Sequence, residues 1–200
     1  RNDNMNNEFR VLVGCEYSGR VRSAFRAMGC DAWSCDILES EDNSPHHIIG
    51  DVSEILHDSW DLAIFHPPCT HLAVSGARHF AEKIADGRQQ AALDFVRLLM
   101  NAPIPRIAIE NPISIISSKI RKPDQIIQPY MFGDPYMKTT CLWLKGLAKL
   151  TPTNIVDGRE QKCWKEPPSP DRWKNRSRTY PGIADAMAKQ WSREFEMYSN

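Results

Sequence analysis

Runs of apolar, strand-like residues alternate along this chain with stretches of helical periodicity, and this alternation restricts the possible fold more than any other feature. Strands are predicted at residues 9–14, 32–35, 61–65, 106–109 and 140–144. Such an alternation is typical of a mostly parallel sheet with helices on both faces. The sequence therefore predicts an α/β protein, and 200 residues are enough for one such domain.

Apolar residues at helical spacing predict the helices between and after these strands, at about residues 19–28, at about 82–100 and near the C-terminus. Gly29 follows the first helix in the position where a left-handed residue costs least. The faces expected to be buried are Val21, Ala24, Phe25 and Met28 in the first helix, Ala91, Phe95 and Leu98 in the second, and Ile183, Met187, Trp191 and Phe195 in the last.

Charge and cysteine content narrow the class of protein. The 25 basic and 25 acidic residues give zero formal net charge, so contact with a nucleic acid has to come from local clustering. The six cysteines form no C-x-x-C pair, which favours reduced thiols and a cytosolic protein. No apolar run approaches the roughly 20 residues of a membrane-spanning helix. A soluble cytoplasmic protein without membrane contact is expected.

Two polar motifs directly follow predicted strands. The strand at 61–65 runs into His66-Pro67-Pro68-Cys69, and the prolines have to leave the sheet because they lack the N–H that a ladder needs. The strand at 106–109 runs into Glu110-Asn111. Ligands of open α/β sheets bind outside the carboxyl ends of the strands. Both motifs are therefore predicted to face one crevice.

Cys69 and Glu110 suit covalent chemistry on a pyrimidine. A thiol that adds to ring carbon 6 makes carbon 5 nucleophilic, which divides one hard step into easier ones. A carboxyl whose pKa is raised in a low-dielectric pocket can protonate ring nitrogen 3, and a buried Glu110 requires some partner. The alternatives are a buried structural cysteine and a glutamate solvated at a strand end.

A glycine-bounded turn joins the first strand to the first helix and suits the close approach of a nucleoside-bearing cofactor. Asp36 ends the second strand, where an acidic side chain can hold ribose hydroxyls. Ordinary α/β turns have the same appearance, so a structural role remains open. The residues of the turn are Gly14, Cys15, Glu16, Tyr17, Ser18 and Gly19.

Between Arg159 and Arg178 basic residues outnumber acidic ones, and Trp164 and Trp173 are interleaved with them. Basic side chains neutralise phosphates and indoles stack on bases, so the segment is a candidate DNA contact. A solvated loop whose tryptophans pack on the core is the alternative. The candidate contacts in this segment are Lys162, Lys165, Lys174, Arg176 and Arg178.

Taken in this order, the motifs resemble the DNA cytosine-5 methyltransferase family, especially its small phage-type members. VLVGCEYSGRVRSAF is similar to the cofactor motif, Pro67-Pro68-Cys69 to the nucleophile motif, Glu110-Asn111 to the glutamate motif and RSRTYPGIADAMAKQW to the last motif. The resemblance covers most of the chain and implies a Rossmann-like methyltransferase fold. It further implies S-adenosylmethionine as cofactor, DNA as partner, Cys69 as nucleophile and Glu110 as acid.

The resemblance also implies further residues of the site and shows two departures from the family. Asp51, His66 and Pro67 are expected beside the cofactor, and Pro68 and Asn111 beside the catalytic pair. The arginine-rich eighth motif is not recognisable, and MKTTCLWL offers only Lys138 as a substitute contact to the pyrimidine. The target-recognition region shrinks to roughly residues 147–178 of a single catalytic domain spanning 1–200, and a phage-encoded protein acting in the cytosol of an infected bacterium is expected.

Three other interpretations remain open at this point. Folate-dependent hydroxymethylation of cytosine with methylene-tetrahydrofolate, or modification of a free pyrimidine nucleotide, would use the same cysteine chemistry. A catalytically silent DNA-binding module would keep the fold alone. A metal site is disfavoured because the spacing of its candidate ligands matches no zinc pattern. These ligands would be His46, His47, His66, His71 and Cys69.

Overall fold

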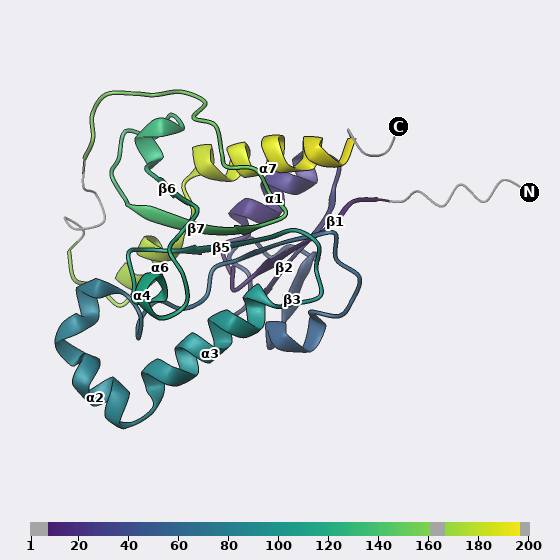
Figure 1. Ribbon diagram of the computed structural model, residues 1–200. Helices are drawn as coiled ribbons and strands as arrows, with labels where there is room; N and C mark the ends of the chain where they lie inside the picture. The colour runs from purple at the N-terminus through teal and green to yellow at the C-terminus, as the bar shows by residue number, and fades with distance from the viewer. Residues whose placement is uncertain (1–7, 161–166, 197–200) are drawn as a thin grey trace, which may run out of the picture.

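A seven-stranded sheet forms the centre of the computed structural model, which describes residues 8–160 and 167–196 (Figure 1). The strands lie in the order β3-β2-β1-β4-β5-β7-β6. β3, β2, β1, β4 and β5 are parallel, whereas β7 runs antiparallel to β5 and to β6. The bounds are β1 Arg10–Gly14, β2 Asp31–Asp36, β3 His47–Ile49, β4 Leu62–Phe65, β5 Ile107–Asn111, β6 Gln125–Ile127 and β7 Thr140–Lys145. The predicted mostly parallel α/β fold is confirmed.

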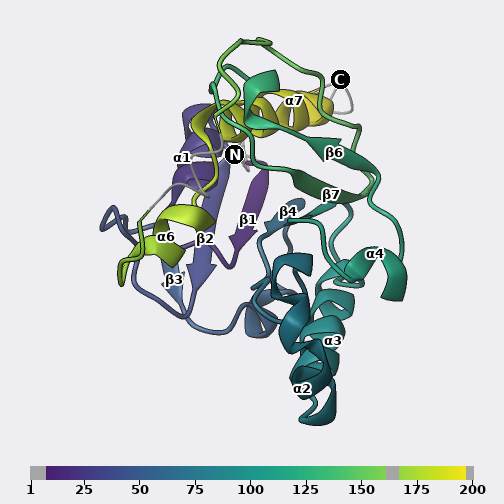
Figure 2. The same ribbon diagram turned by 90° about the vertical axis from the view of Figure 1, so that its left-hand side faces the viewer.

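Helices cover both faces of this sheet. α1 and α7 pack together on one face and α3 lies on the other (Figures 1 and 2). The α-helices are α1 Arg20–Ala27, α2 Phe80–Ala85, α3 Arg88–Met100, α4 Ile116–Lys119, α6 Arg172–Ser177 and α7 Pro181–Glu196. Short 3₁₀ helices are η1 Val52–Ile55, η2 Val74–His79 and η3 Pro129–Met131. None of the described helices combines the length and apolarity that a membrane crossing requires.

The alternation of side chains along each strand divides the core into two layers. Val11 and Val13 of β1 pack on the face of α1 and α7, together with Phe25 and Trp191. Leu12, between the two valines, packs on the face of α3. Burying each large apolar side chain contributes roughly 1.5–3 kcal/mol, so both layers are needed to hold the sheet. The central strands β1 and β4 therefore consist almost entirely of buried apolar residues.

The single helix expected at 82–100 is wrong, because the chain forms α2 and α3 with a break at Gly87. Gly87 has a φ of +79°, which interrupts the helix before α3 begins at Arg88. The apolar residues of α3 that are buried are Leu93, Val96 and Leu99. The predicted face is therefore wrong: Ala91 and Leu98 are exposed and Phe95 is only half-buried.

The other two predicted helical faces are largely correct. Val21 and Phe25 are fully buried on α1, Ala24 is half-buried, and Met28 is exposed at the end of the helix, where the chain already turns towards Gly29. Gly29 adopts the expected positive φ. On α7 the residues Ile183, Met187 and Trp191 are buried, whereas the side chain of Phe195 lies outside the described part of the structure.

Gly182, the second residue of α7, makes a close contact that defines a stability test. A Cβ at this position would collide with the carbonyl oxygen of Phe132 and lie 2.9 Å from the carboxylate of Asp134. Alanine normally favours a helix over glycine, but here overpacking against backbone should cost about 1–3 kcal/mol. We expect Gly182→Ala to lower the urea midpoint of unfolding. Gly50→Ala, where a Cβ meets nothing within 4 Å, is the matched control and should stay near the wild type; equal stability of both variants would contradict the contact.

Candidate active site

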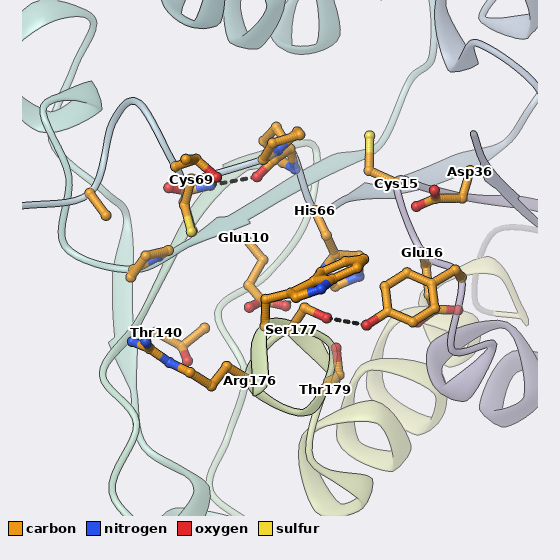
Figure 3. Close-up of a pocket in the computed structure, with 18 of the residues that line it drawn as sticks. Cys15, Glu16, Asp36, His66, Cys69, Glu110, Thr140, Arg176, Ser177 and Thr179 are labelled. Atoms are coloured by element: carbon orange, nitrogen blue, oxygen red, sulfur yellow. Dashed lines mark hydrogen bonds and ion pairs between the residues drawn. The ribbon is translucent and has the colours of Figure 1, made fainter. Parts of the chain in front are cut away.

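A cavity of about 1260 Å³ opens at the carboxyl ends of the parallel strands (Figure 3). It lies at the switch point of the sheet, where β2 and β3 are on one side of β1 and β4 and β5 are on the other, which is where open α/β sheets bind ligands. Pockets for one small ligand usually measure about 300–1,000 Å³. The cavity therefore has room for two ligands side by side.

The residues predicted as catalytic line one half of this cavity. They are Pro68, Cys69, Glu110 and Asn111. Figure 3 shows Cys69 and Glu110 reaching into the same space from neighbouring segments. The structure therefore places the Pro67-Pro68-Cys69 and Glu110-Asn111 motifs at one cavity, as the sequence predicted.

Hydrogen bonds fix the loop that carries Cys69. The carbonyl of Cys69 accepts N–H groups from Leu72 at 3.0 Å and Ala73 at 2.9 Å, and the side-chain amide of Asn111 donates to the carbonyl of Pro67 at 2.9 Å. Burial raises the pKa of the Cys69 thiol, although the positive charges of Lys138 and Arg176 oppose the shift. In the free protein Cys69 is thus held in place as a neutral thiol.

His66 and Glu110 form a buried ion pair, with Nδ1 of His66 2.7 Å from Oε2 of Glu110. Register explains the contact, because Phe65 and Ile109 are partners across β4 and β5, so that the next residues of both strands project side by side. The side chains are only 13% and 14% exposed. His66 is therefore the partner that a buried Glu110 requires.

The pair reverses the expected direction of the Glu110 pKa shift. Burial alone would raise the pKa of Glu110, but the charge of His66 outweighs it and holds this pKa below its ordinary value. For His66, burial opposes the charged form, but the carboxylates of Glu110 and Glu16 outweigh it and raise the pKa. The predicted raised pKa of Glu110 is wrong, because the charge of the neighbouring His66 lowers this pKa more than burial raises it.

The other half of the cavity is lined by most of the residues predicted to bind a cofactor. They are Cys15, Glu16, Tyr17, Ser18, Asp36, Asp51, His66 and Pro67. Gly14 and Gly19 do not line it. Gly14 packs where a Cβ would collide with the ring of Phe65, and Gly19 adopts a φ of +72° ahead of α1. Both glycines shape the turn, and neither forms a surface of the cavity.

Glu16 and Asp51 use their carboxylates to hold local structure. The buried carboxylate of Glu16 accepts backbone N–H groups at the start of α1, from Val21 at 2.9 Å and Arg22 at 3.2 Å. Burial raises its pKa, opposed by His66 and by these hydrogen bonds. Asp51 accepts the N–H of Ser53 at 2.9 Å at the start of η1, and this bond keeps its pKa low.

Asp36 is the carboxylate best placed for a polar ligand in this half. It ends β2 and lines the cavity, and partial burial raises its pKa, opposed by the N–H of Leu38 at 2.9 Å. Ile37, next to it, also lines the cavity although its side chain is 77% exposed. A carboxylate beside an uncovered apolar side chain suits a ligand that has both hydroxyls and a flat ring.

The segment around α6 closes the cavity on its remaining side. The hydroxyl of Tyr17 donates to the carbonyl of Lys174 at 2.9 Å and lies 2.7 Å from Oγ of Ser177. The ammonium of Lys138 donates to the carbonyl of Arg176 at 2.7 Å. Arg178 pairs with Glu41, with Nη2 2.6 Å from Oε1. Lys138, predicted to contact the pyrimidine, thus also anchors this segment.

The predicted basic contacts divide into three groups. Lys138 and Arg176 line the cavity, whereas Lys174 and Arg178 lie outside its lining. Lys162 and Lys165, like Trp164, lie outside the described residues. Trp173 lines the cavity next to Tyr17, with ring centroids 5.9 Å apart, and is 53% exposed. The exposed indole of Trp173 and the side chain of Arg176 lie in the same short helix. Contact of this segment with bases or phosphates therefore stays a prediction.

Several lining residues were missed by the sequence analysis. They include Phe95, Thr140, Ser177 and Thr179. Thr140 lies at the cavity because β7 is antiparallel to β5, so that its first residues meet the end of β5 at the pairing of Asn111 with Cys141. The polar pair Thr139-Thr140 ahead of an apolar strand was the available signal, but strand direction was not predicted.

Among the residues that the structure describes, no three His, Cys, Asp or Glu side chains gather as metal ligands. His47, considered as one ligand, is held by Ser34 at 2.7 Å and by the carbonyl of Leu38 at 2.9 Å. His46 packs edge-on against Trp33.

The fold is similar to a solved methyltransferase structure, EhMeth of Entamoeba histolytica. The TM-score is 0.52 at 18% sequence identity, and the alignment covers 78% of this chain and 58% of that one. The chain thus spans less than two thirds of that neighbour. No protein-family model and no curated protein matches the chain. The similarity shows a methyltransferase-like fold, which agrees with the Rossmann-like fold expected from the sequence.

The ion pair predicts how stability depends on pH. The lowered pKa of Glu110 gives stability that is present above its ordinary value of 4.5 and is lost as pH falls through the lowered value. The raised pKa of His66 gives stability that is present below 6.5 and is lost as pH rises through the raised value. We expect the unfolding free energy of wild type relative to Glu110→Gln to be greatest between pH 4.5 and 6.5. Urea unfolding of both proteins from acid to alkaline pH measures it, and a difference independent of pH would contradict the pair.

Proposed function

We propose that this protein methylates carbon 5 of cytosine in DNA with S-adenosylmethionine as donor, through a covalent adduct at Cys69. The observation that carries this proposal is that the Cys69 thiol and the Glu110 carboxyl line one cavity at the ends of adjacent strands. A thiol and an acid that meet in one cavity suit attack on one atom of a ring and protonation of another. The methyltransferase-like fold and the order of the motifs support the choice of reaction.

Cys69 would act as nucleophile on ring carbon 6. Its sulfur forms a bond to carbon 6 while the electron pair of the carbon 5–carbon 6 double bond moves to carbon 5, which becomes nucleophilic. Asn111 and Pro68 hold the loop in position, because the amide of Asn111 ties the preceding carbonyl of Pro67 to the end of β5. Burial raises the pKa of the thiol, so the S–H bond has to break before attack, with its proton passing to water, and the resulting thiolate forms the bond to carbon 6.

Glu110 would protonate ring nitrogen 3 as sulfur adds. Protonation there neutralises the charge that the sulfur delivers to the ring, so the adduct forms without an isolated buried anion. After transfer, carbon 5 loses its proton to water, the Cys69 sulfur departs with the electron pair of its bond to carbon 6, and ring nitrogen 3 returns its proton to Glu110, which restores the aromatic ring. The net change is replacement of the hydrogen on carbon 5 by a methyl group and release of one proton.

The second half of the cavity fits S-adenosylmethionine. Asp36 is placed for ribose hydroxyls and the uncovered side chain of Ile37 for the adenine ring. Nε2 of His66 is buried without a hydrogen-bond partner among the described residues, so it offers a polar contact to a ligand in this cavity. The cofactor would supply an electrophilic methyl group, and the cavity is large enough to hold it next to a base.

DNA would approach the side of the cavity formed by α6. Lys138 and Arg176 line the cavity there, Lys174 and Trp173 lie in the same segment, and basic and indole side chains suit phosphates and bases. The base would have to leave the duplex, at a cost of a few kcal/mol that these contacts offset. We assign target contact to the region at about 147–178, whose small size favours a recognition sequence that is short, absent or supplied by a partner.

Trapping tests the nucleophile. DNA that contains 5-fluorocytosine should form a covalent adduct with the wild type in the presence of S-adenosylmethionine, because fluorine on carbon 5 cannot leave as a proton does. Gel analysis should show the adduct in the wild type and none in Cys69→Ala. Cys30→Ser removes a thiol at the opposite ends of the strands and should still form it. An adduct of equal yield in Cys69→Ala would refute the assignment.

Label transfer tests the donor and the acceptor. Incubation with DNA and labelled S-adenosylmethionine should put the label in 5-methylcytosine after digestion to nucleosides, and Asp36→Ala should weaken transfer at limiting cofactor because it removes the ribose contact. Parallel incubations use labelled methylene-tetrahydrofolate as donor or free cytidine nucleotides as acceptor. Label that enters cytosine only from the folate, or only in free nucleotides, would replace the proposed reaction with the corresponding alternative.

A further inference from the structure

His66 is placed by the sheet itself to act on Glu110. It lies one residue beyond β4, directly beside Glu110 of β5, because Phe65 and Ile109 are register partners. The backbone N–H of His66 also donates to the carbonyl of Gly14 at 3.0 Å, which ties this position to β1. The imidazole is therefore held from both neighbouring strands, with Nδ1 2.7 Å from the Glu110 carboxylate.

Three charged groups face His66 from the surrounding segments. Glu110 faces it from β5, Glu16 from the turn after β1 and Lys138 from the segment before β7. The two carboxylates outweigh burial and the ammonium, so the pKa of His66 is raised. Nδ1 of His66 lies 2.7 Å from Oε2 of Glu110, whereas Nε2 has no hydrogen-bond partner among the described residues.

Glu110 alone is a poor acid in this position. A group that protonates ring nitrogen 3 has to hold a proton near neutral pH, but the charge of His66 lowers the pKa of Glu110. Nδ1 of His66 lies 2.7 Å from the carboxylate of Glu110, so His66 is the neighbouring group from which Glu110 can take a proton. Two groups coupled in this way titrate as one unit.

We propose, building on the function proposed above, that His66 stores the proton that Glu110 delivers to the pyrimidine. In this step the Nδ1–H bond of His66 breaks and an O–H bond forms on Glu110. The O–H bond of Glu110 then breaks as the lone pair of ring nitrogen 3 takes the proton. His66 ends neutral, Glu110 ends as a carboxylate again, and the ring gains one proton. His66 is thus a positioning residue that acts through Glu110.

The pH dependence of trapping separates proton storage from a purely structural pair. Because burial raises the pKa of the Cys69 thiol, the thiolate fraction grows about tenfold per pH unit across neutrality. The fraction of pairs that hold a proton falls about tenfold per unit above the pKa of His66. Above the pKa of His66, the rise of the thiolate fraction and the fall of the protonated-pair fraction cancel. The logarithm of the single-turnover trapping rate should rise up to the His66 pKa and be flat above it.

Two measurements are compared. NMR of labelled histidines gives the pKa of His66, whose signal is the one that disappears in His66→Gln. Trapping on 5-fluorocytosine DNA gives the pH at which the rate changes slope. In the wild type, we expect the pKa of His66 to equal the pH at which the trapping rate changes slope. In His66→Gln the slope should no longer change at this pH, and the rate at pH 7 should be at least tenfold lower. His57→Gln, at an exposed site outside the cavity, should behave as the wild type.

Each outcome decides the proposal. A wild-type rate that rises through the His66 pKa without a change of slope overturns it, and so does an unchanged profile in His66→Gln. In Glu110→Gln the NMR pKa of His66 should fall because its anionic partner is lost, and an unchanged value overturns the pair itself. This NMR measurement needs no DNA. Failure of the wild type to trap any DNA, with the NMR shift present, would contradict the proposed function and leave the ion pair demonstrated.

Discussion

The parallel pairing of β1, β4 and β5 is the constraint on which the site depends. Gly14 is in register with Phe65, and Phe65 with Ile109, so the three strands end at one level. The residues one position further along each chain segment are Cys15, His66 and Glu110, and they line one cavity although they are far apart in sequence. The two apolar layers hold this register, because a slip of one residue would turn every strand side chain to the wrong face.

Burying the charges of His66 and Glu110 costs free energy. The presence of this pair is therefore better explained by a function than by a contribution to stability. A buried ion pair often contributes less than well-packed apolar residues of the same size, since both ions lose their hydration. Glu16 adds a further buried carboxyl next to His66. A cluster of titratable groups in a cavity is typical of sites that move protons. The sheet thus supports an arrangement that packing alone would not favour.

Strand ends could be predicted from the sequence, but contacts between strands could not. The prolines after Phe65 mark the exit of the chain from the sheet, and the polar Glu110-Asn111 marks the carboxyl end of β5, which extends to Asn111 and not only to the predicted residue 109. The grouping of Cys69 and Glu110 therefore followed from local patterns alone. The partner of Glu110 could not be predicted, because the contact depends on the register between β4 and β5. A shift of one residue in that register would remove it. His66 was accordingly assigned to the cofactor, and the direction of the Glu110 pKa shift was wrong.

Other differences arose from features that a periodic pattern hides. Apolar residues lie on both sides of α3, so the pattern alone does not decide that Leu93 and not Leu98 faces the core, and the helix break at Gly87 depends on a positive φ. The direction of β7 is set by pairing with β5 and not by the composition of Thr140–Lys145. The segment that contains α6 could be recognised from the sequence as basic. Its position could not, because it depends on contacts with Tyr17 and Lys138.

The same α6 contacts join the two halves of the cavity. Tyr17, from the turn after β1, holds the carbonyl of Lys174 and the hydroxyl of Ser177, while Lys138, from the segment before β7, holds the carbonyl of Arg176. Each contact spans a long stretch of sequence, so the wall they form exists only after the whole sheet is assembled. A ligand in either half then meets the same short segment. Because both halves share this wall, donor and acceptor would be brought together by the fold itself.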